Sequence, residues 1–174
     1  MSDMAQPSEI YRLHVMVLHI NPPIWRRLLI PSTTSIAELH DILQISFEWT
    51  DIHLHRFFIR GKAYGVARGG WTRFSTDARK TLLSHLRFRR NERFIYEYDF
   101  CDFWQLQIRI EGVEPIEESK IYPDCIGGAN APPIEDCGGP EAYMDRIEAH
   151  RLGPPLDTLE DFEDALDTIL LISL

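Results

Sequence analysis

Two runs of alternating side chains within residues 94–111 constrain the fold more than any other feature. Every second position is large and apolar: Phe94, Tyr96, Tyr98 and Phe100 in the first run, and Trp104, Leu106, Ile108 and Ile110 in the second. A period of two puts such residues on one face of a β-strand. Cys101 and Asp102 separate the runs, so the sequence predicts an antiparallel hairpin with one apolar face.

The remaining patterns predict further strands and helices around this hairpin. Alternation over 11–20 and 24–30, broken by Asn21-Pro22-Pro23, predicts a second hairpin whose first strand is covered on both faces. Ser35 and Glu38 form a capping-box pattern ahead of a helix that ends near Trp49. We also expect a strand at 55–60, a basic loop at 61–79, a helical turn at 81–86, an irregular segment at 111–140, and helices beginning at Gly139-Pro140 and Thr158.

This order of elements predicts a single α+β domain at 10–174, after a flexible polar tail at 1–9. We expect a mixed or antiparallel sheet, a hairpin–helix–strand start that resembles a β-grasp unit, and C-terminal helices. The buried stripe of the helix at Gly139 should be Tyr143, Met144 and Ile147. The side chains expected to share the core are Trp25, Leu39, Leu43, Phe57, Tyr96, Tyr98, Trp104, Ile108, Phe162 and Ile169.

Charge is distributed unevenly along the chain. Residues 56–96 hold 11 basic and 2 acidic side chains, within a protein whose net charge is −9. Such a basic block can mark a partner surface, or it can be neutralised by the acidic remainder across the fold. Its densest part interleaves Arg87, Arg89, Arg90 and Arg93 with Phe88 and Phe94. That arrangement suits phosphate contact, base stacking or an acidic protein surface.

Cysteine content and hydropathy bear on the compartment. Three cysteines cannot all pair within the chain, which favours a reducing cytoplasm. No run approaches the roughly 18 apolar residues of a membrane span. The first nine residues carry acidic and polar side chains, so we expect neither a signal peptide nor a membrane partner.

Six groups of motifs follow one another between about residues 10 and 150. They are Pro23-Ile24-Trp25-Arg26-Arg27, Leu39-His40 with Trp49, His53-Leu54-His55-Arg56-Phe57, Tyr64-Gly65, Tyr96-Glu97-Tyr98-Asp99-Phe100 with Asp102 and Trp104, and Glu135-Asp136-Cys137-Gly138-Gly139-Pro140 with Tyr143. In this order they resemble the plasmid pRiA4b ORF-3-like family. The resemblance implies an α+β domain found on plasmids and mobile elements, and no established activity.

The chain departs from the family pattern at three positions. Cys101 stands where the family usually has glycine, Leu106 stands where it has histidine, and Ile134 is an insertion before Glu135-Asp136. If the turn at Cys101 needs a positive φ, cysteine costs on the order of 1 kcal/mol relative to glycine. The missing histidine weakens any mechanism that depended on it.

Metal and cysteine chemistry are open alternatives. His53 and His55 would point to the same side of a strand and, with Cys125 and Cys137, could form a Cys₂His₂ zinc site. The two cysteines are twelve positions apart, however, and zinc-ligand pairs are commonly two to four apart. Cys137 precedes a helix start and could act as a nucleophile, although Glu135 and Asp136 oppose thiolate formation. We therefore expect no metal, no cofactor and no catalytic residue.

Four carboxylates, Asp99, Asp102, Glu135 and Asp136, fall in two loops. Such groups can bind Mg²⁺ or perform acid–base chemistry, and they can equally clamp arginines. We favour ion pairs with Arg26 and Arg27, because both arginines lie on a hairpin beside Trp25.

Together these patterns predict a non-enzymatic, cytoplasmic binding module that acts through Arg87, Arg89, Arg90 and Arg93 on an unknown protein partner. The first alternative is a nucleic-acid-contacting accessory protein, which the net charge disfavours. The second is a metal- or cysteine-dependent enzyme.

Overall fold

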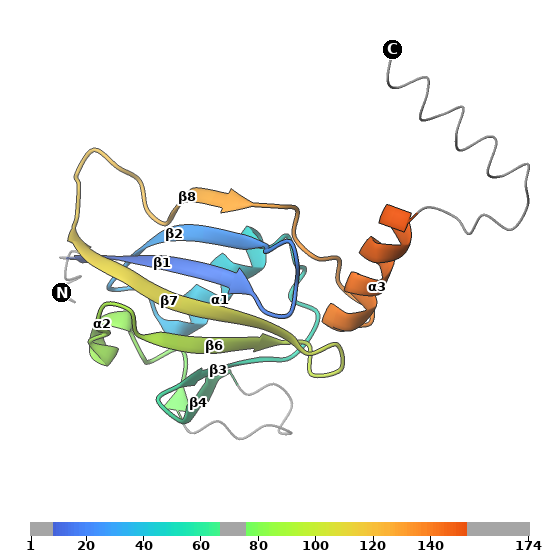
Figure 1. Cartoon of the computed structure of the whole chain (residues 1–174). Helices are drawn as coiled ribbons and strands as arrows, with labels where there is room; N and C mark the ends of the chain where they lie inside the picture. Colours follow the sequence, from blue (N-terminus) through green and yellow to red (C-terminus); the bar gives the residue numbers. More distant parts are fainter. Residues whose placement is uncertain (1–8, 67–75, 153–174) are drawn as a thin grey trace, which may run out of the picture. The chain divides into compact units, whose positions relative to one another are not determined.

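The computed structural model describes residues 9–66 and 76–152, and its main feature is one mixed β-sheet. The described chain divides between Tyr143 and Met144 into two units, each of which is described by itself. The first unit contains eight strands in the order β5-β4-β3-β6-β7-β1-β2-β8 (Figure 1). The strands are β1 (Glu9–Val17), β2 (Trp25–Pro31), β3 (His55–Ile59), β4 (Lys62–Gly65), β5 (Thr76–Asp77), β6 (Arg93–Tyr98), β7 (Trp104–Pro115) and β8 (Asp124–Ala129). The helices are α1 (Ile36–Ser46), α2 (Leu83–Leu86) and α3 (Gly139–Leu152).

Both predicted hairpins are present, and the α+β class is confirmed. β1 pairs with β2, and β6 pairs with β7 in a register that sets Tyr98 opposite Trp104. All neighbouring strands are antiparallel except β4 and β5, which are parallel, so the sheet is mixed. The likeness to a β-grasp unit is limited to element order, because β3 pairs with β4 and β6 and not with the opening hairpin.

The core lies between one face of the sheet and helix α1. The capping box is present: Ser35 accepts a hydrogen bond from the Glu38 backbone, and the Glu38 side chain accepts one from the Ser35 backbone. The helix buries Leu39 and Leu43 among its sheet-facing residues. Trp104 is completely buried, and so are Phe57, Tyr96, Tyr98 and Ile108, as predicted. Phe162 and Ile169 lie outside the described residues.

The opposite face of the sheet is polar and half-exposed, which corrects two expectations. β1 is central, yet Arg12, His14 and Met16 on its second face are only half-buried, so this strand is not covered on both sides. Trp25 is also half-buried; it stacks on His14 of this open face with ring centroids 5.2 Å apart. Ion pairs link the polar side chains of this face. Arg27 pairs with Glu111 and Arg56 pairs with Glu97, each at 2.6 Å.

Several predicted boundaries were wrong. Residues 111–140 contain the end of β7 and all of β8, and the basic loop contains β4. The segment that forms β8 is Asp-Cys-Ile-Gly-Gly-Ala, which has too few large side chains to show alternation. The predicted stripe of α3 is half-buried, and the helix expected at Thr158 lies outside the described residues. In the described ranges no helix has the length and apolar character needed to cross a membrane.

Candidate functional site: an arginine pocket and a loop cluster

Phe88 determines how the arginines of the basic block are presented. Its ring is buried against Phe94, stacked at 5.0 Å, and meets Tyr11 edge-on at 5.9 Å. Arg87 and Arg89 flank this buried residue and are both exposed. Arg87 also ends α2 in the left-handed conformation, with φ 45°. The buried phenyl ring therefore anchors the segment, while its charged neighbours face solvent.

Arg87, Arg89 and Arg90 line an open depression of about 1080 Å³, here called the arginine pocket. Arg60 and Glu92 also line it, and they form a two-point ion pair with distances of 2.6 and 2.9 Å. This pair raises the pKa of Arg60 and lowers the pKa of Glu92 below its ordinary value. Glu92 also accepts a hydrogen bond from the Arg89 backbone, so the Arg60 side chain and the Arg89 backbone together hold its carboxylate.

Unlike Arg60, the side chains of Arg87, Arg89 and Arg90 form no ion pair within 9–66 and 76–152. Every ion pair of those ranges that involves the basic block uses Arg56 or Arg60, and none uses Arg87, Arg89 or Arg90. Arg93 is exposed as well, but it lies on β6 opposite Arg109 and does not line the pocket. The side-chain hydrogen bond of Arg60 and the nearby charge of Arg89 lower the pKa of Glu92, whereas Arg87 and Arg90 form no ion pair with a described acidic residue.

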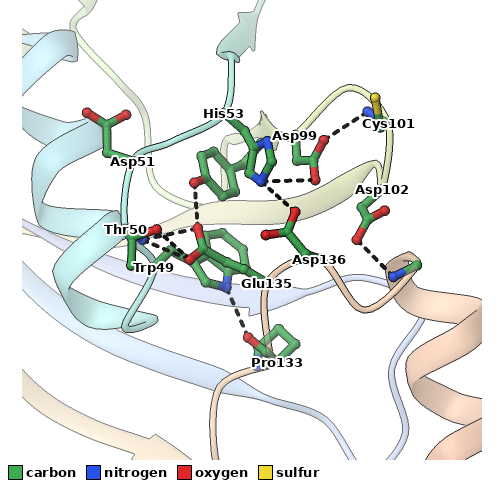
Figure 2. Close-up of polar contacts among 12 residues, drawn as sticks. Trp49, Thr50, Asp51, His53, Asp99, Cys101, Asp102, Pro133, Glu135 and Asp136 are labelled. Carbon is green, nitrogen blue, oxygen red and sulfur yellow. Dashed lines mark hydrogen bonds and ion pairs between the residues drawn. The ribbon is translucent and has the colours of Figure 1, made fainter.

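A second polar group, here called the loop cluster, consists of His53, Asp99, Asp102, Glu135 and Asp136. Figure 2 shows that the carboxylates of Asp99 and Asp136 both point toward the His53 ring. His53 Nε2 is 2.8 Å from Asp136 Oδ1 and 3.6 Å from Asp99 Oδ2. The cluster joins three loops that are far apart in the sequence, because β3 and β6 are neighbours and the β6–β7 turn lies at the same end of the sheet.

Glu135 and Asp102 attach the segment around residue 135 to the rest of this site (Figure 2). Glu135 accepts hydrogen bonds from the Thr50 backbone and hydroxyl, at 3.1 and 2.8 Å, and from the Tyr98 hydroxyl at 2.5 Å. Burial alone would raise the pKa of Glu135, but these hydrogen bonds outweigh burial and lower it. Asp102 accepts a hydrogen bond from the Gly138 backbone at 3.0 Å.

The expected ion pairs between these carboxylates and Arg26 or Arg27 are absent from the described residues. Arg26 instead donates to backbone carbonyls of Trp25, Ser46, Ala129 and Asn130. Arg27 pairs with Glu111 on the open face of the sheet. The prediction failed because the arginines lie on β2, whereas the carboxylates lie in the β6–β7 turn and in the loop between β8 and α3.

His53 and His55 belong to different sites, contrary to expectation. His53 precedes β3 and is not part of the strand, so the two-residue periodicity does not apply to it. His55 is buried and stacks on His40, with centroids 3.5 Å apart and planes 6° apart. His40 is held by the Tyr96 hydroxyl at 2.8 Å and by Asp51 at 2.8 Å.

The cysteines do not assemble a metal site among the described residues. Two groups there have ligand atoms within 4.8 Å of one another, His40–Asp51–His55 and His53–Asp99–Asp136, and neither contains cysteine. Cys125 is exposed on β8, whereas Cys137 is buried with its Sγ 3.9 Å from the Gly139 carbonyl. The proposed Cys₂His₂ combination is therefore not formed.

The three departures from the family pattern have simple structural outcomes. Positive φ angles occur at Asp99 and Phe103 in the β6–β7 turn but not at Cys101, so cysteine carries no left-handed cost there. Leu106 is completely buried in β7, opposite Tyr96. Ile134 is 70% exposed, and the loop accommodates the insertion without drawing Glu135 away from Thr50.

Sequence reasoning missed Thr50, Asp51, Arg60 and Glu92 as members of these sites. None has a local pattern that separates it from an ordinary surface residue. Arg60 and Glu92 meet because β3 ends where β6 begins in the neighbouring strand. Only knowledge of the strand order could have identified that pair.

Comparisons with known proteins agree with this fold and with the positions of the motifs. The family described as plasmid pRiA4b ORF-3-like protein matches residues 9–166. The uncharacterised protein y4hQ of Sinorhizobium fredii is 34% identical over 143 residues, which cover 82% of this chain and 73% of that protein. The crystal structure of MM3350 from Methanosarcina mazei Go1, a protein of unknown function, is similar with a TM-score of 0.75 and 30% identity, covering 91% of this chain and 88% of the other.

Proposed function

The chain belongs to the plasmid pRiA4b ORF-3-like family, and from this premise we propose that it is a non-enzymatic binding module whose arginine pocket holds an acidic segment of a partner protein. The observation that carries the proposal is the presence of three exposed arginines around one depression, without acidic partners among the described residues. Guanidinium groups bind carboxylates through two parallel hydrogen bonds, which makes such a pocket selective for acidic side chains.

The charge of the whole protein favours a protein partner over a nucleic acid. A net charge of −9 repels a polyanion at the distances over which electrostatic steering operates. A short acidic segment needs only local complementarity, because charges farther than about 10 Å are largely screened at physiological salt.

The test is a fluorescence-anisotropy titration with a labelled peptide of alternating glutamate and glycine, at about 150 mM salt. We expect the wild-type chain to bind this peptide, and the variant Arg87→Ala/Arg89→Ala/Arg90→Ala to bind it at least about tenfold more weakly. The control variant Lys120→Ala/Arg146→Ala/Arg151→Ala removes the same charge from exposed positions outside the pocket. The peptide affinity of this control should match that of the wild type. An equal loss of affinity in both variants would show that net charge alone, and not the pocket, determines peptide binding.

The same titration with a labelled DNA duplex tests the nucleic-acid alternative. Three arginines on phosphates would give a log–log salt slope of about −3, and each substitution would remove about one unit. We expect no binding of the duplex at physiological salt. Micromolar or tighter binding of DNA that weakens with salt in this way would overturn the proposal of a protein partner. It would indicate instead that the chain is an accessory protein that contacts nucleic acid.

A further inference from the structure

We propose that His53, Asp99 and Asp136 form a binding site for one divalent transition-metal ion, of which Zn²⁺ is the best match. The sequence predicted no metal, because the spacing of the cysteines and histidines matches no ligand pattern. The fold brings together a different set, one imidazole and two carboxylates from three separate loops. Imidazole and carboxylate are both common zinc ligands.

The distances among the three side chains suit a shared ion. Ligand atoms about 2.0–2.2 Å from a tetrahedral zinc ion lie about 3.3–3.6 Å from one another. His53 Nε2 is 3.6 Å from Asp99 Oδ2 and 2.8 Å from Asp136 Oδ1, and all three ligand atoms lie within 4.8 Å of one another. Side-chain movements of about an ångström or less would bring them to these separations.

A hydrogen bond from His53 accounts poorly for the same arrangement. Nε2 is a buried atom that makes no aligned hydrogen bond, even though Asp136 Oδ1 is only 2.8 Å away. A hydrogen bond is directional and weakens steeply when misaligned, so one N–H cannot serve two carboxylates placed to either side of it. A cation lying between the three groups is attracted to all of them.

Asp99 supplies an independent indication that this site suits a cation. Its side chain is only 4% exposed, and its Oδ1 accepts a hydrogen bond from the Cys101 backbone. Its Oδ2 accepts no hydrogen bond from the described residues and faces His53 at 3.6 Å. Burying an ionised carboxylate costs several kcal/mol unless a hydrogen bond or a positive charge compensates it. In the described ranges no lysine or arginine pairs with Asp99, Asp136, Glu135 or Asp102.

The neighbouring residues hold the site in place without competing for the ion. Glu135 directs its two oxygens to Thr50 and Tyr98, and Asp102 binds the Gly138 backbone (Figure 2). These contacts fix the loop on both sides of Asp136, as outer hydrogen bonds do in metal sites. The side chain of Asp136 is 60% exposed, so an ion can reach the site from solvent.

The second group, His40, Asp51 and His55, is less suitable for a metal. Imidazole binds metals in the plane of its ring, and the rings of His40 and His55 are parallel and stacked at 3.5 Å. An ion in the plane of one ring would therefore lie well out of the plane of the other. Both nitrogens of His40 are also occupied, one by Tyr96 and one by Asp51.

The test is calorimetric titration of Zn²⁺ into the chelator-treated full chain, with bound metal counted by elemental analysis after dialysis. We expect one Zn²⁺ per chain, and at least about tenfold weaker binding in Asp99→Asn and in Asp136→Asn. Asp124→Asn, an exposed carboxylate on β8, is the matched control and should leave affinity unchanged. Circular dichroism of each variant establishes that it is folded.

Cobalt gives a second, spectroscopic readout that reports the ligand geometry around the bound ion. Co²⁺ bound to the wild type should show the visible absorption bands of a tetrahedral nitrogen–oxygen site, and Asp99→Asn should lose them. Absence of stoichiometric binding by folded wild-type protein would overturn the proposal. So would binding that is abolished by Asp51→Asn but retained in Asp99→Asn, because the metal would then belong to the other group.

Discussion

At the scale of single residues, the turns around the loop cluster depend on unusual backbone conformations. Asp99, Phe103 and Asp136 have positive φ angles between 55° and 59°, and Gly138 and Gly139 have φ 94° and 81°. Left-handed conformations cost non-glycine residues about 1 kcal/mol or more, so they persist where surrounding contacts require them. Here those contacts are the hydrogen bonds that the backbone N–H groups of Cys101 and Gly138 donate to Asp99 and Asp102.

Gly139 has no room for a side chain. A Cβ atom placed there would lie 2.2 Å from the backbone oxygen of Asp102. Gly139→Ala should therefore separate the loop from the β6–β7 turn and lower the free energy of unfolding by about 2 kcal/mol or more. Gly61 offers a matched control, because its φ is 75° but nothing lies within 4 Å of its added Cβ.

Chemical denaturation of the two variants measures this difference. Gly61→Ala should lose only about 1 kcal/mol, the cost of the left-handed conformation alone. Equal losses in Gly139→Ala and Gly61→Ala would show that the close approach to Asp102 contributes nothing.

At the scale of elements, the sequence predicted the parts whose side chains alternate in size and polarity. The β6–β7 hairpin and the capping box at Ser35 were recognised because large apolar residues or paired polar groups recur at the spacing of a strand or a helix. β8 was missed, since its two glycines and exposed isoleucine carry no such signal. It forms because β2 offers an open edge.

The candidate sites could be predicted only in part, for a related reason. The carboxylates of the loop cluster and the arginines of the pocket were identified by composition and motif. Their partners were not, because Thr50, Tyr98 and His53 meet Glu135 and Asp136 through strand order rather than through spacing. Long-range pairing of this kind has no local signature in a single sequence.

The open face of the sheet leads to a prediction about acid stability. The hydrogen-bonded ion pair with Arg27 lowers the pKa of Glu111 below its ordinary value of 4.5. A carboxyl group with a lowered pKa in the folded state stabilises the protein at higher pH, and this contribution disappears as the pH falls below about 4.5. We expect Glu111→Gln to cost about 1 kcal/mol near neutral pH and to lose less stability than the wild type as the pH falls through that range.

Thermal denaturation between about pH 7 and pH 3 tests the effect of Glu111. Glu118→Gln is the control, because Glu118 is exposed and forms no ion pair within the described residues. Its pH profile should follow that of the wild type. If Glu111→Gln shows the same pH dependence as the wild type, the pair with Arg27 does not contribute to acid sensitivity.

At the scale of the whole molecule, some arginines of the basic block form ion pairs within the protein and others are exposed to solvent. Part of the basic block is used internally, through Arg56 with Glu97 and Arg60 with Glu92. The arginine pocket remains exposed on the segment that joins α2 to β6, whereas the loop cluster collects carboxylates beside His53. An anionic partner and a cation would therefore be bound at different places on one protein.

A nuclear magnetic resonance titration with the acidic peptide tests whether the arginine pocket is the surface that binds the partner. Adding the glutamate–glycine peptide to isotopically labelled protein should shift the backbone amide signals of residues 83–92 and the side-chain signal of Arg60, which line or support the pocket. Signals from the open sheet face, such as Arg27 and Arg109, should stay in place. Saturable shifts confined to another surface, or no shifts near Arg87, Arg89 and Arg90 at saturating peptide, would show that the arginine pocket is not the surface that binds the peptide.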